Sequence, residues 1–276
     1  MMDDSVEGAT GSAIARTGVR QMRRGWGALA LAAALTMAAT PLAAQEKTGN
    51  KPGFTLAPGS ATIVLMRPEI AVGAQSTGGS YEPNADWTDQ ARENLGKALA
   101  DAQGKLGNRV VTYVEPVGQG AAVAHEYRAL FTALADSVQT YQFFPGNRLP
   151  TKKRDDSFLW SIGPEVAKLP GVQGADYALF VTTEDHYGST GRKLLQIVAA
   201  GVAGVGVSSG VHKGYAGLID LKTGDLVWLN ADLAMGGDVR TPEGATKRVS
   251  QLLEGFPGKP GEAPVTPAVP TQTAAR

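Results

Sequence analysis

Runs of apolar residues predict five strands in this chain. The unbroken run from Ala61 to Met66 predicts a strand covered on both faces, because a strand with one wet face alternates apolar and polar residues. Similar runs predict strands at 108–115 and Tyr177–Thr182. Two further β-type runs flank Lys222–Asp225 and predict a hairpin, with Gly224 in the turn where positive φ is required.

A period of 3.6 residues predicts helices between these strands. Asp86 is suited to cap the first helix, and Thr241 followed by Pro242 is typical of the start of the last one. A short helix is expected at 162–169. The apolar stripes are Trp87, Ala91, Leu95, Ala98, Leu99 and Ala102 in the first long helix, and Val123, Tyr127, Leu130, Phe131, Leu134, Val138 and Tyr141 in the second.

The resulting order is β-α-β-α-(α)-β-α-β-β-α. It predicts an α/β (α+β) fold, with a small mixed sheet flanked by helices, in a single domain over residues 59–256. Residues 45–58 are interpreted as a linker. The proline-rich segment 257–276 has almost nothing apolar to bury, so a disordered tail is expected there.

The N-terminal segment 1–44 has the pattern of a signal peptide. Arginines at 20, 23 and 24 precede the uncharged stretch 25–44, and small residues stand before Gln45, where cleavage is expected. A signal peptide that began at Met22 would start directly with the arginines at 23 and 24, so Met22 is an alternative translation start. Cleavage predicts an exported, periplasmic protein; without cleavage, residues 25–44 would anchor the chain in the inner membrane.

No formally charged residue stands between Lys193 and Lys213. The pattern predicts a helix that packs on the sheet and ends in a glycine-rich exit to a strand near Val211. Glycines and serines dilute the run, which argues against a membrane span in the mature chain. The alternative is a face that contacts a partner or a membrane; its candidate residues are Leu194, Leu195, Val198 and Val202.

The same run contains Gly206–Gly210, which matches the G-x-S-x-G motif of hydrolases at Ser208. That chemistry needs an acid and then a histidine further along the chain. His212 lies two residues past the motif, with no acid between them. The motif therefore does not predict a serine hydrolase.

Glu184, Asp185 and His186 follow the third predicted strand and are the candidate cleft residues, because ligands often bind at the carboxyl ends of strands. Adjacent residues of an extended chain point in opposite directions, which makes a shared site difficult. The chain has no cysteine and three histidines, so neither a metal nor another cofactor is expected. Its 26 basic and 26 acidic residues give no basic field for nucleic acid.

Two segments resemble a family of bacterial envelope proteins. "GADYALFV" (174–181) and "YAGLIDLKTGDLVWLN" (215–230) are similar to the α/β domain of the curli secretion protein CsgG and the penicillin-binding-protein activator LpoB. The resemblance implies a small mixed sheet flanked by helices, and it supplies no catalytic residues. Relatives of this type are typically lipoproteins, whereas this chain lacks the cysteine that carries the lipid.

These observations predict a non-enzymatic exported envelope protein that binds another envelope component or itself. Two alternatives stay open. One is an exported enzyme that uses Glu184, Asp185 or His186, and the other is an inner-membrane protein whose signal is retained.

Overall fold

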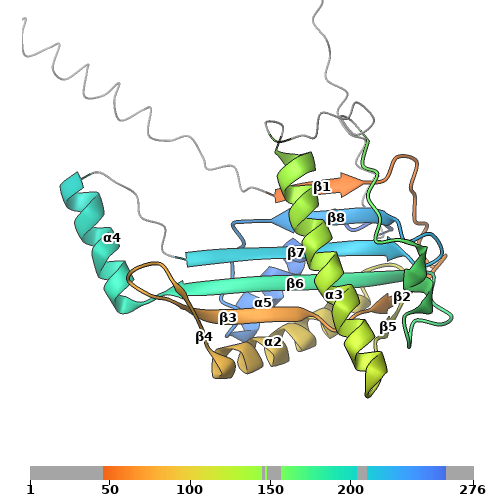
Figure 1. Ribbon diagram of the computed structural model, residues 1–276, viewed down its shortest axis with the longest axis horizontal. Coiled ribbons are helices and arrows are strands. Elements are labelled where there is room, and N and C mark those ends of the chain that lie inside the picture. The colour runs from red at the N-terminus through yellow and green to blue at the C-terminus, as the bar shows by residue number, and fades with distance from the viewer. Residues whose placement is uncertain (1–45, 145–146, 148–156, 204–209, 259–276) are drawn as a thin grey trace, which may run out of the picture. The chain divides into compact units, whose positions relative to one another are not determined.

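The computed structural model describes residues 46–144, 147, 157–203 and 210–258, all within one unit that spans Ala44–Arg276. They form a mixed eight-stranded sheet in the order β1-β8-β7-β6-β2-β5, with β3 paired to β6 and β4 paired to β3 (Figure 1). The mixed α/β fold expected from the sequence is confirmed. The signal segment 1–44, the motif serine Ser208 and the tail beyond residue 258 lie outside the described residues.

The elements have the following bounds. The strands are β1 (Glu46–Asn50), β2 (Thr62–Leu65), β3 (Glu69–Gln75), β4 (Tyr81–Pro83), β5 (Arg109–Thr112), β6 (Tyr177–Gly188), β7 (Gly210–Asp220) and β8 (Leu226–Asp232). The helices are α2 (Ala85–Gln103), α3 (Gln119–Val138), the π-helical turn η1 (Gln139–Phe143), the 3₁₀ helix η3 (Pro164–Lys168), α4 (Thr190–Ala203) and α5 (Pro242–Leu252).

The centre of the sheet is a long antiparallel pair of strands, β6 and β7. Their register runs from Tyr177 opposite Asp220 to Tyr187 opposite Gly210. The other edge of β6 pairs in parallel with β2 over its first part and with β3 over its second part. β6 is therefore hydrogen-bonded on both edges, which makes it a rigid base for the side chains that it carries.

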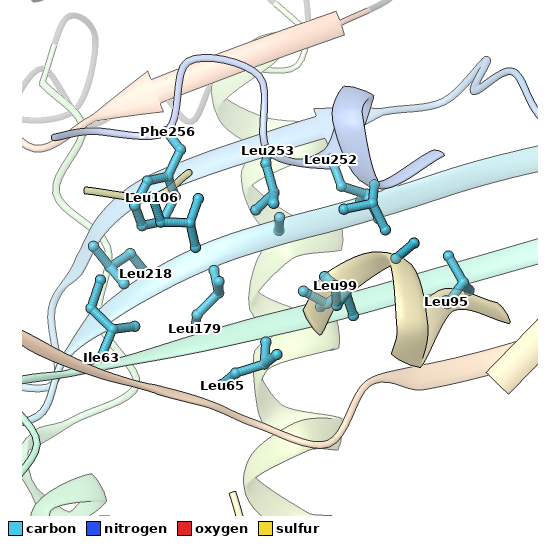
Figure 2. Packing of buried hydrophobic residues seen from close by; sticks show 14 of the residues in the cluster. Ile63, Leu65, Leu95, Leu99, Leu106, Leu179, Leu218, Leu252, Leu253 and Phe256 are labelled. Carbon is cyan, nitrogen blue, oxygen red and sulfur yellow. The ribbon is translucent and has the colours of Figure 1, made fainter. Parts of the chain in front are cut away.

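Helices cover both faces of the sheet. On one face α2 and α5 bury leucines against Ile63, Leu179 and Leu218 (Figure 2). On the other face lies α3 (Figure 1), whose Phe131 stacks on Phe180 with ring centroids 5.0 Å apart. A Cβ atom at Gly217 would lie 2.5 Å from the Phe131 ring, so this close approach depends on glycine.

Three strands and one helix cap differ from the expectation. The polar segment of β1 lies in the part interpreted as linker, yet it pairs with β8 from Glu46 opposite Asp232 onward. Strands β3 and β4 follow Pro68 and were not expected. Asn84, rather than Asp86, caps α2 by accepting a hydrogen bond from the backbone N–H of Trp87, whereas the expected cap at Thr241 is confirmed.

Helix α4 exists, but its expected packing on the sheet is wrong. It connects β6 to the segment before β7, and Figure 1 shows it standing clear of the sheet. Its first turn lies against the β3–β4 turn, where a Cβ atom at Gly191 would be 2.6 Å from the Thr77 hydroxyl. Beyond this turn its large apolar residues are exposed, because no other described element covers them.

Candidate functional site

Strand β6 separates the three candidate cleft residues onto two faces of the sheet. The strand extends to Gly188, so Glu184, Asp185 and His186 lie within it and not after its end. Asp185 points to the face of α2 and α5, since it contacts Arg248 of α5. Glu184 and His186 occupy the alternate positions on the opposite face. One cleft therefore does not contain all three.

Asp185 and Arg248 form a fully buried ion pair, each with 0% exposure of its side chain. Arg248 donates from Nη1 to Asp185 Oδ2 at 2.8 Å and from Nη2 to Oδ1 at 2.7 Å. Its remaining hydrogens reach the Thr183 hydroxyl and the backbone oxygens of Gly236 and Gly237. All five donors of the guanidinium are used, which satisfies the demand that burial of a charge creates.

His212 is the half-buried member of this cluster. It lies opposite Asp185 in the β6–β7 register, and its Nδ1 is 2.7 Å from Asp185 Oδ1. Because Asp185 accepts at this nitrogen, the second ring nitrogen, Nε2, is left to face away from the carboxylate. The side chain is 31% exposed, so His212 connects the buried pair to solvent.

The partners of Asp185 determine its protonation. Burial by itself raises the pKa of this carboxyl, but hydrogen bonds and positive charge from His212 and Arg248 outweigh it and lower the pKa below the usual value. The carboxylate is therefore ionised at neutral pH. An ionised Asp185 fixes the orientation of His212 and connects α5 to the centre of the sheet.

A second cation packs beside this cluster. The guanidinium of Arg240 lies 3.7 Å from the centroid of the Tyr187 ring and 4.6 Å from that of Trp87. It also forms a two-pronged ion pair with Asp238, with Nε–Oδ1 at 2.9 Å and Nη2–Oδ2 at 2.7 Å. Burial, and then the charges of Asp185 and Asp238, raise the pKa of Tyr187, so its phenol stays neutral.

Acid should weaken the fold through Asp238. Its hydrogen bonds to Arg240 lower its pKa from 3.8 to about 2, so the folded state is favoured above pH 3.8 and loses this contribution as the pH falls toward about 2. The variant Asp238→Asn is therefore expected to show a shallower fall of Tm over this interval. Thermal unfolding at a series of pH values measures it, with Asp101→Asn on α2 as the control. An unchanged slope in Asp238→Asn would refute the assignment.

On the opposite face, Glu184 is held between a lysine and a histidine. Lys213 Nζ is 2.8 Å from Glu184 Oε2, and His186 Nε2 is 2.7 Å from Oε1. Tyr81 stacks on the His186 ring with centroids 4.1 Å apart. Lys213 thus balances the charge of Glu184 within the fold.

The predicted contact residues lie on an exposed helix face. Leu194 is 62% exposed, Ile197 70% and Val198 53%, and Leu195 is also exposed. The half-buried residues of α4 are instead Arg192, Gln196 and Ala199. The helix is thus inverted relative to an ordinary surface helix, because its large apolar residues are exposed while polar and small ones are half-buried. Val202 belongs to the same helix, but its side chain is not among those described.

The described residues offer little else that would hold a ligand. They contain no group of three or more metal-ligating side chains, and no helix among them is long and apolar enough to cross a membrane. A cavity of about 370 Å³ lies between the segment 172–177 and the β7–β8 turn, and its polar lining includes Asp176, Asp220 and Lys222. None of the predicted site residues lines it.

No sequence pattern singles out Arg248 or the pairing of His212 with an acid. Sequence reasoning found no acid between Ser208 and His212, but the partner, Asp185, comes from an earlier strand through the β6–β7 register. Only knowledge of that register could have brought the two together. Ser208 itself lies outside the described residues.

The architecture defines a mixed α/β domain with helices on both faces of its sheet. The chain matches no family model, and no curated protein matches it. Among solved structures it is similar to the PelC dodecamer from Paraburkholderia phytofirmans, with 16% identity, a TM-score of 0.31, and coverage of 78% of this chain and 97% of the other.

A second similar structure is a DUF4136 family protein from Bacteroides thetaiotaomicron, with 11% identity, a TM-score of 0.30, and coverage of 75% of this chain and 92% of the other. The resemblance to the CsgG and LpoB type of domain stays a prediction.

Proposed function

We propose that this protein is a non-enzymatic, exported module of the cell envelope that binds another envelope component or itself through helix α4. The observation that carries the proposal is the outward apolar face formed by Leu194, Ile197 and Val198. Large exposed apolar groups on one side of an element are typical of interaction sites. The signal-like segment 1–44 supports delivery to the periplasm.

The polar clusters support binding over catalysis. The donors of Arg248 are all directed at groups of the fold itself, and Glu184 is neutralised by Lys213. Groups that are satisfied internally stabilise a structure and leave little capacity for a substrate. Such a stabilised domain is suited to hold α4 in a fixed position for binding.

Photocrosslinking in cells tests the proposal. A photoreactive residue at Ile197 is expected to yield a covalent adduct with an envelope component or with a second copy of the chain. The same residue at Val117, which is 92% exposed and precedes α3, is the control and should yield none. Absence of any adduct specific to Ile197 would sink the proposal.

The contact between Asp185 and His212 favours a second candidate function, an exported enzyme. In it His212, oriented by Asp185, would act as a general base through Nε2. Loss of turnover in His212→Ala, with normal folding and with full turnover in His125→Ala, would support this candidate over the binding module. Equal turnover of His212→Ala and His125→Ala in an activity screen would eliminate the enzyme candidate.

Retention of the signal segment would give the inner-membrane alternative. For the exported module we expect the mature chain to begin at Gln45. N-terminal sequencing of the protein recovered from cells decides between the two. A sequence that begins before residue 25 would support the anchored form.

A further inference from the structure

We infer that the occupant of the α4 face is the surface of a lipid bilayer that contains anionic headgroups. The inference rests on the proposed function, since it names the envelope component that α4 binds. It starts from the inverted orientation of the helix. Leu194, Ile197 and Val198 follow each other at i, i+3 and i+4 and form one apolar strip, which the described part of the fold leaves uncovered.

The length of α4 is suited to lying on a bilayer and not to crossing it. Its 14 residues correspond to about 21 Å, whereas a hydrocarbon core is about 30 Å thick. A helix with one apolar side and one polar side lies in the interface plane, with its apolar side among the acyl chains. Arg192 and Gln196, on the other side of α4, are half-buried, and Arg192 lies close to the β3–β4 turn.

The charges on α4 favour anionic headgroups. Lys193 is exposed in its first turn, and no aspartate or glutamate occurs from Thr190 to Ala203. Basic residues near a membrane surface are attracted by anionic lipids. An acidic protein surface would also attract a basic residue, but the small convex surface of α4 argues against a protein partner.

A protein partner, including a second copy, would need more surface than α4 provides. Stable protein interfaces take roughly 800 Å² and 20–30 residues from each side. The apolar face of α4 offers Leu194, Leu195, Ile197 and Val198 on a convex helix. A bilayer requires no complementary shape, because acyl chains adapt to any apolar side chain.

Co-sedimentation with vesicles tests the inference, with the chain recovered from the periplasm as the cell processes it. Vesicles of phosphatidylglycerol mixed with phosphatidylcholine are expected to bind the wild type, and pure phosphatidylcholine vesicles to bind it more weakly. Ile197→Glu and Leu194→Glu should each reduce binding by at least about tenfold, since a carboxylate is costly among acyl chains. Val117→Glu adds the same charge at an exposed site away from α4 and should bind like the wild type.

Charge reversal and oligomeric state complete the test. Lys193→Glu should reduce binding to the anionic vesicles and leave binding to the neutral ones nearly unchanged.

Equal vesicle binding by Ile197→Glu and Val117→Glu, or absence of wild-type binding, would overturn the inference. If the wild type does not bind vesicles, but is an oligomer that Ile197→Glu dissociates, the occupant is a second copy and the proposed function stands. If a photoreactive residue at Ile197 also yields no adduct in cells, the bilayer inference and the proposed function are both wrong.

Discussion

Replacement of Arg248 by methionine is expected to lower the free energy of unfolding by about 3–5 kcal/mol. The change leaves Asp185 buried without its ion-pair partner, and the backbone oxygens of Gly236 and Gly237 lose their donor. Urea unfolding followed by circular dichroism measures the effect. The difference in unfolding free energy between the wild type and the variant should be smaller at acid pH. The reason is that the isolated Asp185 carboxyl of the variant takes up a proton more readily than the paired one of the wild type.

A matched arginine distinguishes this effect from the loss of any charge. Arg92 pairs with Asp89 on the exposed side of α2, and Arg92→Met should cost less than about 1 kcal/mol because water screens that pair. A similar small loss for Arg248→Met would show that the buried pair does not connect α5 to β6. The conclusion that the pair of Asp185 and Arg248 stabilises the packing of α5 on the sheet would then be wrong.

Phe131→Ala is expected to destabilise the domain by about 3–5 kcal/mol, since it opens a cavity between α3 and the sheet. The ring is 1% exposed and packs on Phe180 and over Gly217. The neighbouring Leu130 is 44% exposed, so Leu130→Ala is the control and should change the unfolding free energy less. Equal effects in chemical denaturation would contradict the packing of α3 described above.

The regular elements could be predicted because their apolar spacing is local information. The stripe of α2, with Ala91, Leu95 and Leu99, and the turn of the β7–β8 hairpin at Gly224 both appear where expected. The second half of β6 could not be predicted, since the polar residues Thr183 to His186 are typical of a loop. They are extended because β3 and β7 pair with both edges of this segment.

The contacts of Asp185 could likewise be predicted only in part from the sequence. Alternation along a strand predicts that Asp185 points away from Glu184 and His186, and the structure has this arrangement. The identity of the partners of Asp185 depends on the register with β7 and on the packing of α5, to which the sequences around His212 and Arg248 give no local clue. Long-range pairing of this kind is beyond pattern analysis.

Helix α4 illustrates a different limit. Periodicity correctly places Leu194 and Val198 on one side of a helix, but it does not say what that side faces. An apolar face normally lies on the core, so packing on the sheet was the natural expectation. Here the helix leaves the sheet at the end of β6, and the face points outward.

Thiol labelling at Ile197 tests the central claim most directly. The chain has no cysteine, so Ile197→Cys and Val117→Cys each introduce a single reactive thiol. In the purified protein both should react rapidly with a polar maleimide, because both positions are exposed. In intact cells with a permeable outer membrane, Ile197→Cys should react several-fold more slowly, while Val117→Cys should be unaffected. Equal labelling of both positions in cells, or slow labelling of Ile197→Cys in the purified monomer, would contradict the claim that α4 presents a contact face to the envelope.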